Sequence, residues 1–398
     1  MTDITIRQIK GEEMLEVKYP LGTYAFSSSP PLPDKEEWKE RVRHRQGVTC
    51  LAAFEDKVAV ATVAYTAMRQ NARGALLGMG GVWGVSTHPA ARRKGYSRQL
   101  MMRLLEAMHS SGKALSGLYP FRESFYERLG YVTLPQIRKA RFAPLTLAPL
   151  LKMDLGGEVE LTLIGDGYET YVDYLRQMQQ HTHGMATFDI GDRHSAQRNR
   201  FWMAVARVDG KTVGLMLYDL KGEKETEFKL RAMRFYYCSS QGRYLLLQWI
   251  ARHIDQANRV ELWLPPFELP ETWLADMDVT VETAYFTPMG RVVDVAQIGG
   301  MHTGPGCFST RVTDPLCPWN EGIWRFETLD GVLQVHPVTS VEGATDCTLS
   351  IQALTALIYG THDPDDFIFR NWGNPSTQLQ TTMRVMFPRM LPHMHEIF

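Results

Sequence analysis

The residues of this sequence that could do chemistry most directly are a basic run closed by a glycine, Arg92-Arg93-Lys94-Gly95. The run follows an apolar stretch that ends near Val85 and precedes Leu100 to Met108, where apolar residues recur at helical spacing. A pyrophosphate group needs converging backbone N–H donors and the positive end of a helix dipole. Gly95 would let the backbone turn tightly, and the basic side chains would neutralise phosphate oxygens. We therefore predict a phosphate-binding loop between a strand and a helix.

A basic run also has a second interpretation, because charged residues are common at the solvated start of a helix. The flanking strand and helix favour the phosphate site. The strand end at Val85, Ser86 and Thr87 could also offer backbone groups to an extended ligand arm that carries amides. The loop has neither the GxxxxGK[ST] pattern of a P-loop nor the GxGxxG pattern of a dinucleotide site, so neither of those sites is predicted.

The elements around the loop predict a small α/β unit. Two β-rich runs between Gly47 and Tyr65 flank the turn Glu55-Asp56-Lys57 and predict a hairpin. A strand from Leu76 to Val85 leads into the loop, and a helix that stops near Gly112 follows it. A further strand is expected from Ala114 to Tyr119. This order of strand, loop, helix and strand implies a right-handed βαβ crossover.

The middle of the chain repeats this order in weaker form. A hairpin is expected from Phe201 to Asp219 with its turn at Asp209-Gly210, followed by a strand from Leu230 to Cys238. A helix from Arg243 to Ile254 and a strand from Val260 to Leu264 complete the repeat. Two copies of one supersecondary order suggest internal duplication.

The second copy has Ser239 to Arg243, SSQGR, in place of the basic glycine loop, so we expect a degenerate copy without a cofactor site. After Pro288 the pattern changes to another α/β unit. It has a hairpin from Trp324 to Val335, turning at Asp330-Gly331, and a helix from Gln352 to Tyr359. The predicted fold class is therefore α/β (α+β), with three domains: residues 1–150, 151–287 and 288–398.

Composition limits the classes of partner. The chain of 398 residues is too long for one ordinary core, and its net charge of -1, from 43 basic and 44 acidic residues, gives no sign of nucleic acid or an anionic membrane as partner. No apolar run reaches the roughly 20 residues of a membrane-spanning helix, and the first residues are too acidic for a signal peptide. Five scattered cysteines without CxxC spacing argue against a disulfide framework and a zinc site. We expect a cytoplasmic protein.

The loop resembles the Arg/Gln-x-x-Gly-x-Gly/Ala acetyl-CoA motif of the GNAT acetyltransferases, with Ser97 in the last place. The whole chain resembles the Eis (enhanced intracellular survival) family, through VSTHPAARRKGYSR (85–98), FYERLGY (125–131), MGRVVDV (289–295) and the terminal phenylalanine. That resemblance implies a GNAT domain, a degenerate GNAT-like domain and a sterol-carrier-like domain in this order.

The resemblance also implies acetyl-CoA as co-substrate and no metal. The residues that it places at the cofactor are Val85, Ser86, Thr87, Arg92, Arg93, Lys94, Gly95, Tyr96, Ser97, Arg98, Phe121 and Arg122.

Two further groups would supply acid and base chemistry. Tyr126 lies on a short helix expected from Phe121 to Leu129, which Gly130 closes. The resemblance implies that Tyr126 protonates the leaving thiolate, whereas the residues alone favour a core tyrosine with a satisfied hydroxyl. It also implies that the α-carboxylate of Phe398 is the general base. Such a group is a weak base, with a pKa of about 3.5 in the open, and the alternative is a frayed tail.

The acceptor is less defined. The resemblance implies a primary amine of a polycation, in particular an aminoglycoside, and a homo-oligomer, commonly a hexamer. Glu396 could attract a cationic acceptor. Asp34, Glu36 and Glu37 fit the first turn of a solvated helix better than the acceptor entrance. Trp38 and Trp83 could form apolar walls of the acceptor site, or they could be core residues.

Other interpretations stay open at this point. The acceptor could be a protein lysine or a polyamine. The chain could instead bind lipid through the sterol-carrier-like domain, or be an inactive GNAT scaffold. The pairs His181/His183 and His393/His395 have the spacing of some metal ligands, but no cysteine or carboxylate pattern accompanies them, so structural histidines are expected.

Overall fold

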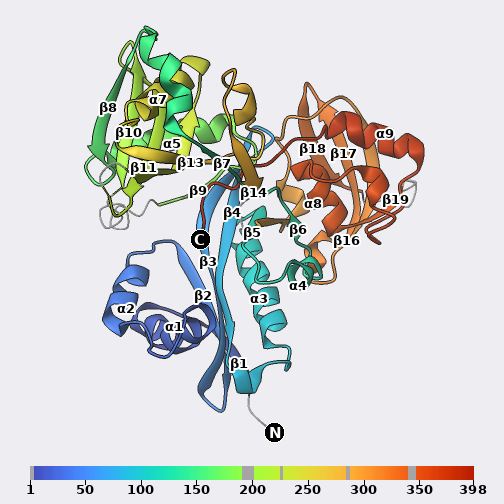
Figure 1. Cartoon of the computed structure of the whole chain (residues 1–398). Helices are drawn as coiled ribbons and strands as arrows, with labels where there is room; N and C mark the ends of the chain where they lie inside the picture. The colour runs from blue at the N-terminus through green and yellow to red at the C-terminus, as the bar shows by residue number, and fades with distance from the viewer. Residues whose placement is uncertain (1–3, 191–200, 225–226, 284–286, 339–346) are drawn as a thin grey trace. The chain divides into compact units, whose positions relative to one another are not determined.

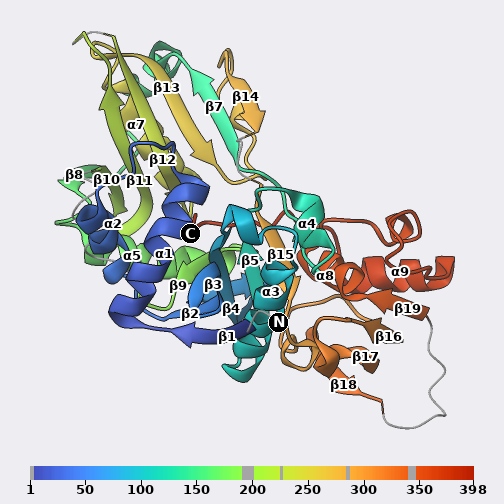
Figure 2. The ribbon, with the colours of Figure 1, turned by 90° about the horizontal axis from the view of Figure 1, so that it is seen from below.

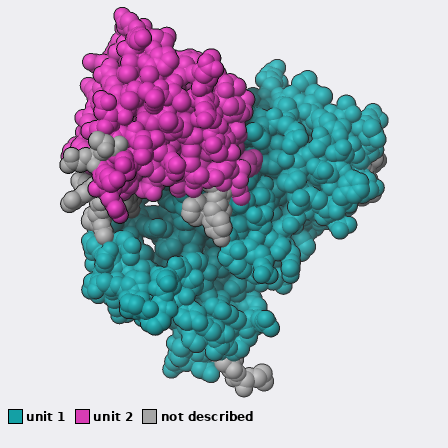
Figure 3. Space-filling model, viewed as in Figure 1, with its two compact units in different colours: residues 1–134, 182–192, 287–398 teal, residues 135–181, 193–286 magenta. Residues whose placement is uncertain are grey.

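The computed structural model describes residues 4–190, 201–224, 227–283, 287–338 and 347–398 (Figure 1). The chain forms two compact units (Figure 3), of which unit 1 comprises Met1–Leu134, Thr182–Asp192 and Thr287–Phe398. Unit 2 comprises Pro135–His181 and Arg193–Phe286. In the described part of the chain, no helix is both long enough and apolar enough to span a bilayer.

Unit 1 contains an eight-stranded sheet in the order β1-β2-β3-β4-β5-β15-β6, with β9 paired to β3. Neighbouring strands are antiparallel except for β4 and β5, which are parallel and joined through a helix as expected. The strands are β1 (Ile4–Ile9), β2 (Val48–Glu55), β3 (Val58–Ala72), β4 (Ala75–Thr87), β5 (Leu115–Leu118), β6 (Val132–Thr133), β9 (Ala186–Phe188) and β15 (Met289–Val292).

Helices cover both faces of this sheet (Figure 2). The crossover helix α3 (Tyr96–Ser110) packs on the face to which β2 presents Leu51 and Ala53. The helix α1 (Gly11–Phe26) covers the opposite face, to which β2 presents Cys50 and Ala52. This alternation along β2 is the two-residue period of a strand that is buried on both faces. Two shorter helices are α2 (Lys35–Arg43) and α4 (Glu123–Glu127).

Unit 1 also contains a four-stranded sheet in the order β18-β17-β16-β19. Its elements are β16 (Cys307–Thr313), β17 (Gly322–Leu329), β18 (Val332–Pro337), β19 (Cys347–Ser350), α8 (Ile351–Tyr359) and α9 (Thr377–Met386). The apolar helix α8 is buried almost throughout and packs on β15. One apolar core therefore runs from Met68 and Met79 of the first sheet to Phe326 of this sheet and Leu354 of α8.

Unit 2 is a seven-stranded sheet in the order β14-β7-β13-β12-β11-β10-β8. Its elements are β7 (Arg138–Phe142), β8 (Glu158–Leu163), α5 (Tyr168–His181), β10 (Trp202–Val208), β11 (Lys211–Lys221), β12 (Phe228–Tyr237), α7 (Ser240–Ala251), β13 (Ala257–Leu264) and β14 (Thr280–Thr283). Here β10 to β13 repeat the order of β2 to β5: two antiparallel pairings, then a parallel pair joined by a helix. The expected duplication is visible in this repeat.

The three expected hairpin turns are confirmed at Asp56-Lys57, Asp209-Gly210 and Asp330-Gly331. Both residues of each turn have positive φ, which two-residue hairpins of the I′ type require and which aspartate and glycine tolerate well. The domain limits near 150 and 287 stay a prediction. The compact units follow other limits, because β7 pairs with β13 in unit 2 and β15 enters the first sheet of unit 1.

Candidate active site

The strand β4 is irregular where the phosphate loop begins. Its pairing with β3 shifts so that Gly84 and Val85 together lie opposite Val63, which makes a β-bulge with Gly84 at φ +62°. On the other side, the parallel pairing with β5 ends at Val82. Beyond Val82, β4 therefore has no strand partner on its β5 side among the described residues, and its backbone groups can meet an extended ligand there.

The loop itself turns through two residues of positive φ, Arg93 at +65° and Gly95 at +86°. Gly95 is the N-cap residue of α3, and no side chain caps the helix from that position. The first N–H groups of α3, at Tyr96 and Ser97, have no acceptor within the helix. This end of α3 therefore offers backbone donors and a positive dipole, as a phosphate site requires.

The basic side chains of the loop are exposed and partly tied down. Lys94 lies 2.8 Å from the Glu55 carboxylate, and this contact, together with a hydrogen bond from Tyr96, lowers the pKa of Glu55. The Arg92 guanidinium carbon lies 5.9 Å from the centre of the Tyr24 ring. Glu55 thus holds the loop against the β2–β3 turn, and the remaining positive charge faces solvent.

Ser86, Thr87 and Ser97, which are expected at the cofactor, have side chains that are hydrogen-bonded within the protein. The buried Ser86 hydroxyl lies 3.0 Å from that of Thr62, and the Thr87 hydroxyl lies 2.9 Å from that of Ser97. The second contact fixes the end of β4 to the first turn of α3. At Ser86, a ligand would therefore meet the backbone rather than the hydroxyl.

Tyr126 lies on α4 with its side chain buried among aromatic rings. Its ring centre lies 5.0 Å from that of Phe125, 5.8 Å from that of Phe121 and 6.0 Å from that of Tyr131. Burial, with a smaller effect of Tyr131, raises the pKa of the Tyr126 phenol well above its ordinary value. The phenol is therefore protonated at neutral pH, the state that a proton donor needs.

A buried ion pair fixes the end of α4. Arg291, on β15, donates to both carboxylate oxygens of Asp314 at 2.9 and 2.8 Å, and to the carbonyl of Leu129 at 2.8 Å. Gly130 makes room for this guanidinium: its φ is +89°, and a Cβ there would lie 1.6 Å from an Arg291 nitrogen. The backbone that follows Tyr126 is therefore held by a residue 165 positions further along the sequence.

The C-terminal segment lies over the first sheet. The Phe398 ring stands edge-on to Tyr119 at 5.6 Å, and the Tyr119 hydroxyl donates to the Glu396 carbonyl at 3.0 Å. Two glycines that face each other in β4 and β5 leave space for the segment. A Cβ on Gly81 would lie 3.1 Å from the Phe398 ring, and one on Gly117 would lie 3.0 Å from Met394.

Hydrogen bonds anchor the same segment to the β3–β4 turn and to the residues that precede β9. The Arg73 guanidinium donates to the carbonyls of Pro388 at 2.9 Å and of Ile358 at 2.7 Å. The His183 carbonyl accepts from the His393 N–H at 2.9 Å. The imidazole of His183 accepts from the Arg73 N–H through Nδ1 at 3.1 Å and donates to the Tyr359 carbonyl through Nε2 at 3.1 Å. The imidazole of His183 therefore has a structural role, and His393 takes part through its backbone N–H.

Tyr126 and Phe398 line one cavity of about 400 Å³, which also reaches Val85 at the β4 bulge. We call it the Tyr126 cavity. Besides Tyr126 and Phe398, the aromatic residues that line it are Phe26, Trp38, Trp83, Tyr119 and Phe121. Trp38 and Trp83 are therefore walls of the cavity, which was one of their two interpretations. Arg122 is exposed and does not line it.

Two charged residues of this cavity, Lys18 and Arg45, were missed by the sequence reasoning. Lys18 is buried on the apolar face of α1, between Leu15 and Leu21. A lysine at a spacing of three from two leucines was the signal that could have found it, because a lysine seldom lies on a buried face without a purpose.

Comparison with known proteins agrees with this geometry. Residues 5–134 match the acetyltransferase (GNAT) domain family, and residues 301–383 match the sterol carrier protein domain family. The first domain is a GNAT acetyltransferase domain. By that domain the chain is an acetyltransferase of the class that uses acetyl-CoA. No curated protein sequence matches the chain.

Solved structures share the fold over the whole chain. A GCN5-related N-acetyltransferase from Anabaena variabilis matches with a TM-score of 0.82 at 16% identity, over 100% of both chains. A probable N-acyltransferase from Enterococcus faecalis matches with 0.81 at 19% identity, and Eis1 from Mycobacterium abscessus with 0.80 at 16%, again over 100% of both chains. The expected likeness to the Eis family is thus confirmed for the fold.

The acidic residues that were weighed as acceptor contacts have other partners. Asp34 caps α2 by accepting from the Glu37 N–H at 2.7 Å, and Glu36 lies 3.7 Å from Lys39. Glu396 lies 3.2 Å from the His395 imidazole and is not part of the cavity lining. The described lining of the Tyr126 cavity therefore includes no aspartate or glutamate.

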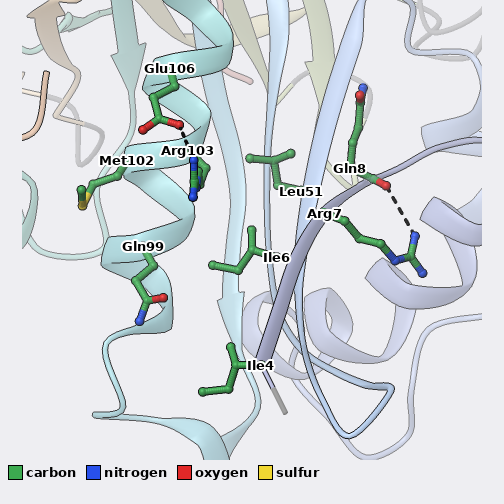
Figure 4. A pocket seen from close by; sticks show the side chains of 9 residues that line it. All are labelled: Ile4, Ile6, Arg7, Gln8, Leu51, Gln99, Met102, Arg103 and Glu106. Atoms are coloured by element: carbon green, nitrogen blue, oxygen red, sulfur yellow. Dashed lines mark hydrogen bonds and ion pairs between the residues drawn. The ribbon is translucent and has the colours of Figure 1, made fainter.

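A larger groove of about 610 Å³ lies between β1 and α3 (Figure 4). Ile4, Ile6 and Met102 line its apolar side, and Arg103 and Glu106 pair at 3.0 Å at its rim. No tyrosine, histidine or cysteine lines it among the described residues, so it has no counterpart of Tyr126. The smaller cavity is the better candidate for chemistry.

The central repeat offers a contrast to the cofactor loop. The side chain of Ser239 caps α7 by accepting from the Gly242 N–H at 3.1 Å, so the helix end is satisfied internally. A Cβ on Gly242 would lie 2.2 Å from the Val213 carbonyl oxygen, which shows how closely the backbone packs there. No group of three or more potential metal ligands occurs among the residues that the structure describes.

Proposed function

We propose that the chain transfers the acetyl group of acetyl-CoA to a primary amine by direct attack, within the Tyr126 cavity. One observation supports this most: Tyr126, Phe398 and the bulge at Val85 line the same cavity. The strand end would hold the amide-bearing arm of acetyl-CoA, and the N-terminus of α3 would hold its pyrophosphate. Bound there, acetyl-CoA supplies the thioester.

In this proposal the residues divide the proton transfers. The amine nitrogen forms a bond to the acetyl carbon while the bond from that carbon to sulfur breaks. The Tyr126 hydroxyl, which is protonated and neutral at neutral pH, gives its proton to the departing sulfur. The terminal carboxylate of Phe398 takes the proton of the amine, directly or through a water.

The test combines Tyr126→Phe with a chain extended by one alanine after Phe398, and follows coenzyme A release with a panel of amines. General acid or base groups typically contribute 10²- to 10⁴-fold, so we expect kcat to fall by about 10²-fold or more in both variants, with acetyl-CoA binding retained. Tyr218→Phe, which removes the hydroxyl of a buried tyrosine in unit 2, is the control. An unchanged kcat in Tyr126→Phe would remove Tyr126 from the mechanism, and full activity in the extended chain would remove Phe398.

Two finer expectations rest on the resemblance alone. These are an aminoglycoside acceptor and a hexamer, and light scattering of the purified chain tests the hexamer. The expected cytoplasmic location rests instead on the composition of the chain. A protein lysine or a polyamine is the other kind of acceptor in the panel.

Lipid binding through residues 301–383 is the alternative function. Stoichiometric lipid uptake without acetylation of any amine would favour it. Neither of the two cavities described above is lined by residues of that match.

A further inference from the structure

The Tyr126 cavity contains positive charge from two side chains that lie against one indole ring. Lys18 Nζ lies 4.3 Å and the Arg45 guanidinium carbon 4.6 Å from the centre of the Trp83 ring. The described lining contributes no acidic side chain, so among its described residues the terminal carboxylate of Phe398 is the one negative group that faces these two basic side chains. An aminoglycoside, which carries several ammonium groups, would add like charges to the cavity at short range.

Of these two basic side chains, Lys18 is the one whose positive charge is less compensated by its surroundings. The residue is about 2% exposed, and among the described residues its amine has one hydrogen-bond acceptor, the Gly84 carbonyl oxygen at 3.5 Å. No carboxylate among the described residues forms an ion pair with it. Burial, and then the charge of Arg45, lower its pKa. A buried ammonium in this position is costly unless an anion accompanies it.

The position of Lys18 relates it to the proposed chemistry. Gly84 is part of the β4 bulge, and a Cβ at that position would lie 2.6 Å from Lys18 Nζ. The glycine therefore lets the lysine amine reach the strand end that borders the cavity. Val85, the next residue, lines the same cavity together with Tyr126.

The remainder of the lining is mostly apolar and aromatic, from Phe26, Trp38, Tyr119 and Phe121. A volume of about 400 Å³ suits a small molecule. The cavity thus combines a place for an anionic group with a wall for an apolar one.

We propose that the acceptor is a small amine that also carries a carboxylate, as an apolar or aromatic amino acid does, and that Lys18 and Arg45 bind this carboxylate. The inference rests on the proposed function and narrows its acceptor. The carboxylate supplies the counter-charge that Lys18 lacks, and the aromatic residues hold the apolar part. The positive charges of Lys18 and Arg45 favour an amine that carries a carboxylate over a neutral or polycationic amine.

The first test measures binding without turnover, in the full chain with coenzyme A present. The probes are N-acetylphenylalanine and its amide, products that differ in the charge of one group and have no free amine. A charge-assisted contact is typically worth about 1.5–3 kcal/mol, so calorimetry should give about 10- to 100-fold tighter binding of the acid. Equal binding of the two, or tighter binding of the amide, would overturn the inference.

The second test assigns the preference to Lys18. In Lys18→Met the apolar stem is retained and the charge is lost, so the preference for the acid should fall about 10-fold or more. Lys35→Met is the matched control, because Lys35 is exposed on α2, pairs with Glu16 and does not line the cavity. A preference that survives in Lys18→Met would contradict the assignment. Arg45→Gln replaces Lys18→Met if the latter does not fold.

Turnover separates this inference from the proposed function. With phenylalanine, phenylalaninamide and kanamycin as acceptors, coenzyme A release should be fastest per unit concentration with the acid. Preferential acetylation of kanamycin would overturn the inference and support the proposed function. Preferential binding of the acid without acetylation of any amine would support the anion site and overturn the proposed function.

Discussion

At the scale of single residues, the position of Tyr126 depends on groups that are distant in the sequence. The carbonyl of Leu129, just after α4, accepts from Arg291, whose charge is compensated by Asp314. Asp314 and the nearby Cys317 more than offset burial, so the pKa of Arg291 lies above its usual value and the guanidinium remains charged. Arg291 is therefore a positioning residue, which acts on the phenol through the backbone of α4.

Gly130→Ala tests this arrangement. The new Cβ would occupy the place of an Arg291 nitrogen, at 1.6 Å, so the guanidinium must leave Asp314. Disrupting a buried ion pair typically costs about 3–5 kcal/mol, and we expect an unfolding free energy lower by about 3 kcal/mol, measured by chemical denaturation. We also expect kcat to fall, because the loss of the Arg291 contact would displace Tyr126.

The control for this prediction is Gly210→Ala. Gly210 also has positive φ, +74°, but a Cβ there would meet no atom within 4 Å. Backbone strain alone should cost about 1 kcal/mol. Equal losses in the two variants would show that strain, and not the displaced arginine, explains the effect at Gly130.

At the scale of elements, β4 combines three tasks. It pairs with β3, and it carries the bulge at Gly84 and Val85. At Gly81 it leaves space for the C-terminal segment. The stretch from Gly78 to Gly84 is rich in glycine, although glycine weakens a strand. Gly81 faces the ring of Phe398, whereas a Cβ on Gly80 would meet Met108 and one on Gly84 would meet Lys18. Side chains are absent where the chain's own end must approach the sheet closely.

Gly81→Ala should therefore reduce activity more than stability. Its Cβ would lie 3.1 Å from the Phe398 ring and 2.5 Å from the sulfur of Met68, a flexible side chain. Displacing a reacting group by about 1 Å can cost roughly 10²-fold, so we expect kcat lower by about 10- to 100-fold. The double variant with Phe398→Leu, which keeps the terminal carboxylate but removes the ring, should regain part of the activity. No rescue would mean that the ring of Phe398 does not transmit the effect.

At the scale of the whole molecule, the chain leaves unit 1 and returns to it twice. Local patterns predicted the hairpins and the strand-loop-helix-strand orders, because Asp-Gly turns and apolar periods are local properties. They did not predict that β9 and β15 enter the first sheet, because the sequence of a short strand does not indicate which strand it pairs with. The loop between β4 and α3 was predicted from its local pattern, whereas the role proposed for Tyr126 came from the family resemblance and stays a prediction. Lys18 was overlooked, although its spacing from Leu15 and Leu21 places it on a buried helix face. Arg291 and the glycine pair have no such local signal, because their roles are contacts between distant segments.

The returning segment at 182–192 makes stability depend on pH through His183. Burial, and then the charge of Arg73, lower the pKa of His183 to about 4, although its hydrogen bond to the Tyr359 carbonyl opposes this. Above about pH 6.5 the imidazole is neutral in the folded and the unfolded chain and has no effect on stability. Between about 6.5 and 4 the unfolded chain binds the proton and the folded chain does not. The unfolding free energy therefore falls as pH falls through this window.

The full loss attributable to His183 is about 3 kcal/mol, from 1.36 kcal/mol for each unit of pKa difference. Denaturant titrations from pH 7.5 to 4 should show a shallower decline in His183→Gln than in the unmodified chain, because glutamine takes up no proton. His88→Gln, at an exposed histidine, is the control and should retain the full slope. Because His183 also holds His393 of the C-terminal segment, kcat should fall along with stability at low pH. Equal slopes in all three chains would mean that other groups determine the acid sensitivity of this fold.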